Sequence, residues 1–258
     1  MKTLLIDGDI FIYRITAASE IPIEWDNDLW TLHSDLDSCR EVLDRQIAEY
    51  KEALKADEIV IALSPPTNFR YRIYPQYKSN RKGKRKPITY HPLKNYTISN
   101  YITYQRPDIE GDDILGILAT SPVIIKGDKT IVSLDKDMRT IPCTYCDMRD
   151  PITEVTVTED EANYHHMLQT LTGDTADGYP GCPGIGAVTA EKILTETDGT
   201  YTEMWKAVIK TYEKKGLSEE TALIQAQIAR ICRRNDYDFK KKEVKLWTPP
   251  TTTTKTAS

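Results

Sequence analysis

Short apolar runs that end in pairs of acidic residues constrain the fold of this chain most. Residues Lys2–Ile6 form such a run, typical of a strand buried in a parallel sheet, and the acidic stretch Asp7–Asp9 follows it directly. A second run, Thr130–Leu134, ends in the same way at Asp135–Asp137. Because the carboxyl ends of parallel strands meet at one edge of an α/β sheet, the usual place for a site, we expect both acidic pairs to lie at that edge.

Strand-like and helix-like segments alternate along the first half of the chain. Apolar residues recur with helical spacing over Ile10–Ala18 and Asp35–Leu54, and Ile59–Leu63 has the pattern of a second buried strand. Val123–Ile125 and Thr153–Val157 also have strand character, the latter as an edge strand. The alternation predicts an α/β fold with a mostly parallel central sheet flanked by helices.

A third group of acids is the densest in the chain. Glu110, Asp112 and Asp113 stand immediately before the apolar helical face Ile114–Leu118, so we expect them on the first turn of a helix, where the dipole tolerates negative charge. Taken alone, this stretch is better explained as an ordinary acidic N-cap on a helix. What favours a site is the recurrence of acidic pairs beside apolar runs elsewhere in the chain.

The fourth acidic pair, Asp174 and Asp177, lies in a segment too rich in glycine and proline for a helix or a strand. A helix is expected to resume over Ala187–Thr195. Glycines before that helix would let the backbone turn tightly and expose N–H groups at its start, which is a phosphate-binding arrangement, although simple turns use glycine as well. These glycines are Gly181, Gly184 and Gly186.

The formal net charge of −5 is unevenly distributed. No Asp or Glu occurs from Ile59 to Pro107, so this segment carries +10 and the remainder of the chain −15. Phe69–Gln105 reads as irregular and contains seven tyrosines. Positive charge with interleaved rings suits single-stranded or frayed nucleic acid, because phosphates meet Lys and Arg while bases stack; the alternative is a solvated loop with tyrosines packed beneath it. The basic residues are Arg70, Arg72, Lys78, Arg81, Lys82, Lys84, Arg85, Lys86, Lys94 and Arg106.

If the acidic groups converge, their mutual repulsion is costly without cations. Hard divalent cations take oxygen ligands, so Mg²⁺ or Mn²⁺ is the natural partner. Two such ions about 4 Å apart can hold a phosphodiester, activate water and stabilise the leaving oxygen. The residue pattern therefore predicts a metal-dependent phosphoryl-transfer enzyme acting on nucleic acid, without distinguishing a nuclease from a polymerase or DNA from RNA.

The second half of the chain is expected to be mainly helical. Thr158–Glu161 resembles a capping box that opens a helix over Asp160–Leu171. Two amphipathic helices follow, at about Tyr201–Lys214 and Ser218–Arg234. We predict an α/β core over residues 1–158, a helical region over 159–247 and a disordered tail over 248–258.

Composition narrows the setting of the protein. The five cysteines, odd in number and dispersed, predict a reduced, cytoplasmic chain, and the single C-x-x-C at Cys143 and Cys146 lacks the second cysteine pair that a zinc site needs. No apolar run approaches the length of a membrane span, and no signal peptide is expected.

Five motifs occur in order along the chain: Leu4-Leu-Ile-Asp-Gly8; Phe69-Arg70 with Tyr77-Lys78-x-x-Arg81; Glu110-Gly-Asp-Asp113; Asp135-Lys-Asp137; and Leu171-Thr-Gly-Asp-x-x-Asp-x-x-Pro-Gly-x-x-Gly-Ile-Gly186. Together they resemble the flap-endonuclease-like 5′-nucleases, which include the 5′-nuclease domain of bacterial DNA polymerase I and stand-alone bacteriophage 5′–3′ exonucleases. The resemblance spans about Leu4 to Leu194. It implies a PIN-like sheet, a basic arch over residues 69–106 and a helix–three-turn–helix element over about 159–196.

The resemblance also implies roles for individual residues. Lys78 and Arg81 would contact the scissile phosphate, with Arg70 nearby on the backbone. Asp9 lies outside the motif, as a helix cap or a group behind the ligands. Two Mg²⁺ ions would be bound or oriented by Asp7, Glu110, Asp112, Asp113, Asp135, Asp137, Asp174 and Asp177. Further contacts to DNA are expected from Arg72, Tyr77, Lys82, Lys84, Arg85, Lys86, Gly181, Gly184, Gly186 and Lys192, with K⁺ at the helix–three-turn–helix element.

The sequence departs from the family pattern at one place. Members usually carry another Asp just after the second strand, whereas Ser64-Pro-Pro66 stands there, which puts the strength of one metal site in doubt. The function implied is a 5′–3′ exonuclease on duplex DNA in phage replication, recombination or primer removal. It would also act on RNA–DNA hybrids, as a monomer working beside replication proteins in the host cytoplasm and not at a membrane.

Three other functions remain open at this point. A structure-specific flap endonuclease would use the same residues. A non-catalytic DNA-junction binding protein would use the acids only as helix caps. A nucleotide-binding oxidoreductase is poorly supported, because the glycine fingerprint is missing after the first strand.

Overall fold

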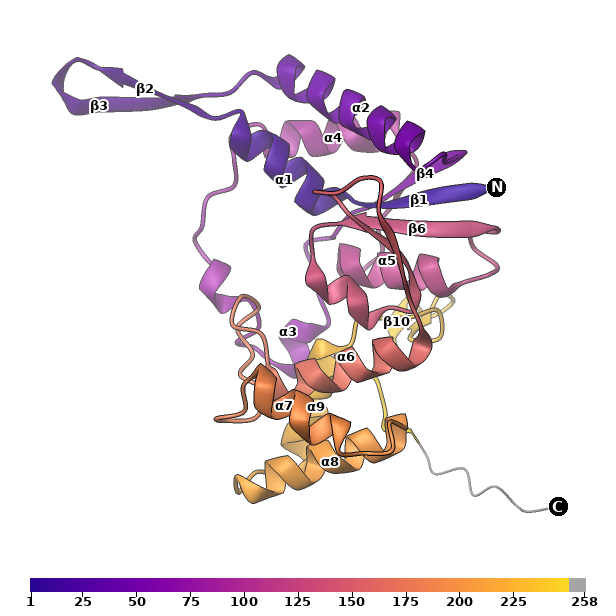
Figure 1. Cartoon of the computed structure of the whole chain (residues 1–258). Coiled ribbons are helices and arrows are strands. Elements are labelled where there is room, and N and C mark those ends of the chain that lie inside the picture. The colour runs from indigo at the N-terminus through magenta and orange to yellow at the C-terminus, as the bar shows by residue number, and fades with distance from the viewer. Residues whose placement is uncertain (251–258) are drawn as a thin grey trace.

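A six-stranded sheet forms the centre of the computed structural model, which describes residues 1–250 (Figure 1). The strand order is β5-β4-β1-β6-β7-β8; the first five strands are parallel, and β8 runs antiparallel to β7. The strands are β1 (Lys2–Asp7), β4 (Glu58–Ala62), β5 (Thr103–Tyr104), β6 (Asp128–Ser133), β7 (Cys143–Asp147) and β8 (Glu154–Val157). The predicted α/β class with a mostly parallel sheet is confirmed, as is the edge strand at β8.

Helices cover both faces of this sheet. One face carries α1 (Gly8–Ala18), α2 (Leu36–Ala53) and α4 (Tyr90–Asn100), and the other carries α5 (Gly111–Thr120) (Figure 1). Because successive strand residues point to opposite faces, Leu4 of β1 packs with the first group and Leu5 with α5. Both strand faces are therefore apolar, as the continuous hydrophobic run in β1 predicts.

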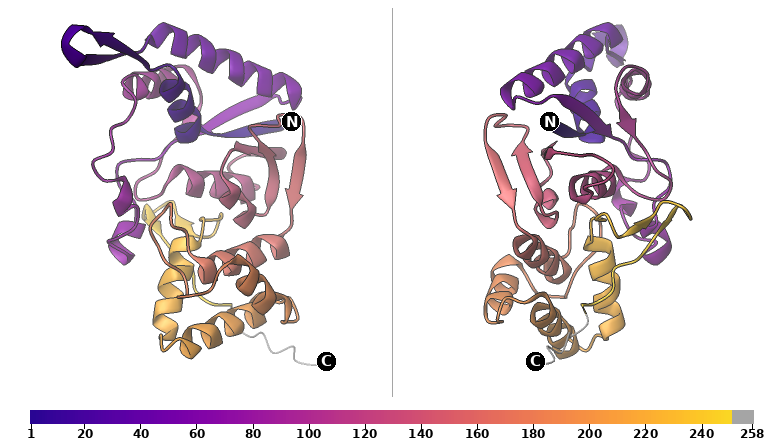
Figure 2. Two further views of the ribbon diagram at one scale, coloured as in Figure 1. Left: turned by 60° about the vertical axis from the view of Figure 1, so that its left-hand side comes forward. Right: turned by 90° about the vertical axis from the view of Figure 1, so that its right-hand side faces the viewer.

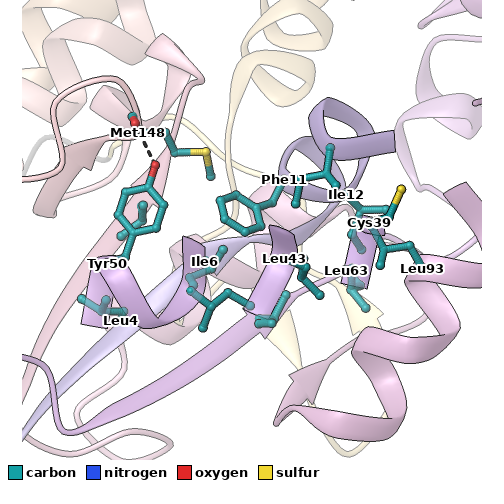
Figure 3. Packing of buried hydrophobic residues seen from close by; sticks show 14 of the residues in the cluster. Leu4, Ile6, Phe11, Ile12, Cys39, Leu43, Tyr50, Leu63, Leu93 and Met148 are labelled. Atoms are coloured by element: carbon teal, nitrogen blue, oxygen red, sulfur yellow. Dashed lines mark hydrogen bonds between the residues drawn. The ribbon is translucent and has the colours of Figure 1, made fainter. Parts of the chain in front are cut away.

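The first of these cores is built around α1 (Figure 3). Phe11 of α1 belongs to this core together with Leu43 of α2 and Leu93 of α4, and all three side chains are almost fully buried. The hydroxyl group of Tyr50 donates to the carbonyl oxygen of Met148 at 2.7 Å, which ties α2 to the segment after β7. This packing fixes α1, and with it the acidic residues at the start of that helix.

The helical region has a core of its own, set below the sheet (Figure 2). It consists of α6 (Glu159–Thr172), α7 (Ala187–Thr195), α8 (Tyr201–Lys214) and α9 (Glu219–Ala229). The capping box at Thr158 and Glu161 is present at the start of α6, as predicted. Among residues 1–250, no helix is both long and apolar enough to cross a membrane.

The helix α9 ends at Ala229, five residues earlier than predicted. Beyond it the chain is extended, because Ile231 and Cys232 pack beneath α5 in the same core as β1. The short strands β9 (Tyr237–Asp238) and β10 (Glu243–Val244) follow. The end of the chain thus returns to the α/β core, and the division at residue 158 stays a prediction. Residues 251–258 of the predicted disordered tail lie outside the described part of the chain.

The stretch 69–105 is less irregular than predicted. It contains α3 (Arg70–Ile73), the 3₁₀ turn η2 (Ser79–Arg81), α4 and β5. The hydroxyl groups of Tyr96 and Tyr101 both donate to Asp44 of α2 at 2.6 Å, and Tyr90 is buried. These hydrogen bonds hold α4 against α2, and the buried ring of Tyr90 is not available to stack on bases.

Other elements also differ from the sequence pattern. The expected strand at Val123–Ile125 is a turn instead, and Ile125 is its only buried residue. The hairpin of β2 (Ile21–Trp25) and β3 (Leu29–His33), joined by η1 (Asp26–Asp28), was not predicted and projects from the body of the protein (Figure 1). An additional strand, β7, was also missed, because its polar residues hide its position inside the sheet.

Gly116 is the point of closest approach between α5 and the segment that returns from α9. A Cβ atom at this position would collide with the carbonyl oxygen of Cys232. We expect Gly116→Ala to lower the free energy of unfolding by about 1–3 kcal/mol, measured by urea denaturation. Gly186→Ala is the matched control, since nothing lies within 4 Å of a Cβ atom there; equal stability of both variants would contradict the packing described.

Candidate active site

Carboxylates from three elements meet at the carboxyl edge of the sheet. Asp7 ends β1, Asp135 follows β6, and Asp112 lies in the first turn of α5. The hydroxyl group of Ser133 donates to Asp7 at 2.7 Å and accepts the backbone N–H of Asp135 at 3.0 Å. Ser133 therefore links the two strand ends, a role that its sequence position two residues before Asp135 could have suggested.

The glycine-rich loop after α6 brings in the fourth acidic pair. Asp174 accepts the backbone N–H groups of Ala176 at 2.6 Å and Asp177 at 3.2 Å, and its own backbone pairs with Tyr179. This turn aims the carboxylate of Asp177 at the basic stretch that contains Lys78.

Lys78 is the centre of a bonded network. Its ammonium group donates to Glu110 at 2.6 Å and lies 3.6 Å from Asp177, while its backbone N–H donates to the carbonyl oxygen of Asp177 at 2.7 Å. The Tyr77 hydroxyl group is within hydrogen-bonding distance of both carboxylates, at 2.8 and 2.9 Å. Arg81 pairs with Asp177 at 2.6 Å. The residues of this predicted motif therefore do lie beside the acidic cluster.

Four carboxylates of the cluster have no ion-pair partner among residues 1–250: Asp7, Asp112, Asp135 and Asp137. Burial raises the pKa of Asp7 to about 7, and the negative charges of Asp9 and Asp135 add to this. Burial and the charge of Asp135 raise the pKa of Asp137 to about 7. The pKa values of Asp112 and Asp135 are also raised, by burial first and by neighbouring carboxylates second. The cluster therefore has an unbalanced negative charge.

The structure revises the roles predicted for Arg70 and Asp113. These two residues form a buried bidentate pair with N–O distances of 2.7 and 2.8 Å, and Asp113 also accepts the backbone N–H of Cys232. Although burial raises the pKa of Asp113, the charge and hydrogen bonds of Arg70 outweigh it and hold that pKa below the usual value. Because Asp113 is fully buried and Arg70 only 3% exposed, neither side chain is presented to a metal ion or a phosphate in this arrangement.

Asp9 is not a helix cap, since Asp7 caps α1. Its carboxylate accepts the backbone N–H of Ser64 at 2.6 Å, the Tyr90 hydroxyl group at 3.0 Å and the Lys94 ammonium group at 3.2 Å. Where the family pattern places an acid after the second strand, this chain thus has Ser64 with the Asp9 carboxylate bonded to its backbone.

Other residues of the basic stretch are distributed around this site. Arg72 pairs with Asp108, Arg85 pairs with Glu20, and Lys86 lies 4.0 Å from the centre of the Tyr90 ring. Lys82 and Lys84 are exposed. No contact in the structure assigns a function to these five residues, so their contact with DNA stays a prediction.

The loop glycines have different surroundings. Gly181 is buried against Gly173, and its N–H donates to Gln225 at 2.9 Å. This N–H is therefore not free to bind a phosphate, contrary to the prediction. Gly184 and Gly186 are exposed. Gly186 is the N-cap residue of α7 and has no side chain that could accept a hydrogen bond from the first N–H groups of the helix. Lys192 is exposed on the same helix. The start of α7 therefore keeps exposed backbone N–H groups, as a phosphate site requires.

The donor set fits divalent cations in its chemistry, because several buried carboxylate oxygens lack a positive partner. Within residues 1–250, however, no group of three or more His, Cys, Asp or Glu side chains is arranged to hold a metal ion as it stands. Both carboxylate oxygens of Glu110 and of Asp177 already accept hydrogen bonds, from Tyr77, Lys78 and Arg81.

The raised pKa of Asp7 predicts a pH dependence of stability. Between its ordinary value of 3.8 and about 7, the folded state holds a proton that the unfolded chain releases, so this carboxyl group makes unfolding easier as pH rises through that range. In EDTA, we expect Asp7→Asn to have a higher free energy of unfolding than the native chain. The difference should grow from pH 4 to pH 7 and stay constant above pH 7. Glu52→Gln, an exposed change, should show no such growth; a flat margin for Asp7→Asn would contradict the assignment.

The two neighbouring acids of α5 should respond oppositely to neutralisation. Asp113→Asn leaves Arg70 buried without its charge partner, so we expect a loss of about 3–5 kcal/mol in the free energy of unfolding. Asp112→Asn removes repulsion and should leave metal-free stability unchanged or higher. Urea denaturation at pH 7.5 with EDTA compares them, and similar losses in both would show that Asp113 has no special structural role.

Comparisons with known proteins agree with this geometry. Residues 2–167 match the family model described as 5′-3′ exonuclease, N-terminal resolvase-like domain. The exonuclease of Escherichia phage T7 is 31% identical, over 95% of this chain and 93% of that protein. The exodeoxyribonuclease of Enterobacteria phage T3 is also 31% identical, over 95% and 92%.

The fold has a counterpart among solved structures. A bacteriophage T5 flap endonuclease, solved as a pseudo-enzyme–product complex with DNA and metal ions, superposes with a TM-score of 0.68 at 15% identity, over 89% of each chain. The two phage relatives are similar over nearly their whole length, and the family model covers most of the α/β core together with α6. The chain therefore belongs to the 5′–3′ exonuclease family.

Proposed function

We propose that this protein is a divalent-metal-dependent 5′–3′ exonuclease that hydrolyses phosphodiester bonds from the 5′ ends of duplex DNA. The observation that carries the proposal is the meeting of seven carboxylates from four separate segments beside Lys78 and Arg81. A helix-capping role does not require such a meeting, so the DNA-junction binding alternative is the weaker one.

The residues suited to hold the metal ions are Asp7, Glu110, Asp112, Asp135, Asp137, Asp174 and Asp177. When bound, divalent cations would activate water and stabilise the charge that develops on the phosphate. Two Mg²⁺ ions, replaceable by Mn²⁺, remain our proposal for their identity and number. Asp113 is left out of this set because Arg70, Glu110 and Cys232 occupy both of its oxygens.

The chain's own cations would bind and orient the phosphate. Lys78 is held by Glu110 and by the backbone of Asp177, so its ammonium group is fixed at the edge of the cluster. Arg81 is half-exposed and adds a second positive charge there. Charges fixed before the reaction stabilise a developing negative charge without reorganisation.

Binding of the duplex further away is proposed for the start of α7. Exposed N–H groups after Gly186, together with Lys192, suit contacts to the phosphate backbone that carry no sequence information. The same proposal includes K⁺ at this loop and cleavage of RNA in RNA–DNA hybrids. It also includes a monomeric state, work beside replication proteins and a location in the host cytoplasm.

A structure-specific flap endonuclease is the second candidate, since the T5 protein of similar fold has that name. Product length discriminates the two activities on 5′-labelled duplex and flap DNA. Mononucleotides or short fragments from the duplex support the exonuclease, whereas release of an intact flap with little attack on the duplex supports the endonuclease.

Asp135→Ala tests the catalytic assignment. We expect cleavage of 5′-labelled duplex DNA with Mg²⁺ to fall by about 100-fold or more, because one of the central carboxylates is lost. Asp160→Ala, which removes an exposed carboxylate of α6, should cleave at the native rate. EDTA should stop cleavage by the native chain and by Asp160→Ala. Equal cleavage by the two variants would end the assignment, and calorimetry that finds no divalent-cation binding to the native chain would favour the non-catalytic alternative.

A further inference from the structure

A pocket lined mainly by apolar side chains, with Arg106 at its border, lies between β5, α5 and Phe239 of the C-terminal segment. It has a volume of about 200 Å³, with Tyr104, Ile117 and Phe239 in its lining. An adjoining pocket of about 370 Å³ shares Arg106 and Phe239 with it and is bordered by Lys242. None of these side chains takes part in the acidic cluster, so the pocket is unexplained by the proposed function.

Tyr237 forms part of the wall of the larger pocket. Its side chain is only 3% exposed, and its ring is held edge-on against Phe239, with centroids 5.1 Å apart. The hydroxyl group is buried as well and has no hydrogen-bond partner among residues 1–250, so it is closed to a ligand in the pocket as the structure stands. The packing of the two rings therefore holds this wall of the pocket.

The charge around the pocket is positive. Lys240, Lys241 and Lys242 are exposed on the turn between β9 and β10, and Arg106 lies on the opposite border. Asp238 ends β9 just before this turn, and its carboxylate accepts the backbone N–H groups of Lys240 and Lys241 at 2.9 and 3.0 Å. The other acids nearby are Glu243 on β10 and Asp108, which pairs with Arg72.

We propose that this pocket binds an acidic peptide segment of a partner protein. One apolar side chain of the peptide would enter the 200 Å³ pocket, and neighbouring carboxylates would pair with Arg106 and Lys242. Because β5 is the edge strand of the sheet, an extended peptide can also lie along it.

A peptide fits these features better than single-stranded DNA does. The floor of the pocket is mostly aliphatic, whereas bases bind by stacking on aromatic rings. These aliphatic residues are Ile109, Ile114, Ile117, Leu118 and Ile124. This inference does not depend on the nuclease proposal.

Fluorescence anisotropy with the full-length chain tests the proposal. The probe is a fluorescein-labelled peptide Glu-Asp-Asp-Phe-Asp-Glu, compared with the same peptide carrying Gly in place of Phe. We expect the Gly peptide to bind at least about tenfold more weakly, because the apolar anchor is lost. Tyr237→Phe removes only a buried hydroxyl group that the peptide does not reach, so it should bind the Phe peptide as the native chain does.

Charge variants complete the test. Arg106→Glu and Lys242→Glu should each reduce peptide binding, whereas Lys51→Glu, an exposed change on α2, should not. Thermal midpoints by circular dichroism verify that the variants are folded. Equal binding of the Phe and Gly peptides, or unchanged binding by Arg106→Glu and Lys242→Glu, would overturn the proposal. Competition by a thymidine decanucleotide, with parallel losses of its binding in the same variants, would assign the surface to nucleic acid instead.

Discussion

The buried pair of Arg70 and Asp113 is the interaction on which the arrangement of the site depends. Arg70 donates to both oxygens of Asp113 and to the carbonyl oxygens of Ile228 and Arg230, at 2.7–2.9 Å. Asp113 in turn accepts the N–H of Glu110 at the start of α5. One contact thus joins the basic stretch, the first turn of α5 and the segment after α9. Because a buried ion pair adds little net stability, its contribution here is to fix position.

The second constraint is the backbone of Lys78. This residue has a φ of 51°, in the left-handed region that a residue with a side chain adopts at a cost of about 1–3 kcal/mol. Its N–H bonds to Asp177 and its ammonium group to Glu110, and Asn80 donates to two carbonyl groups of the same loop. The contacts that keep this conformation therefore also bring the glycine-rich loop to the sheet edge.

Much of this fold follows from local patterns in the sequence. The strands β1, β4 and β6 are apolar runs, and the rule that parallel strands end at one edge correctly brings Asp7 and Asp135 together. The Arg70–Asp113 pair does not follow, because a basic residue in a basic stretch has the pattern of an exposed one, and 43 residues separate it from its partner. The structural use of Tyr96 and Tyr101 is hidden for the same reason, since Asp44 is distant in sequence.

The charge balance at the sheet edge shows where external cations are needed. Lys94 neutralises Asp9, which fills the place beside Ser64, and Lys78 and Arg81 neutralise Glu110 and Asp177. The carboxylates of the cluster that form no ion pair with the described chain are the four whose pKa values are raised. They are Asp7, Asp112, Asp135 and Asp137. Lys78 and Lys136 offset the repulsion among these four only in part, because the pKa values of the four stay raised, so cations that bind there would relieve the remainder.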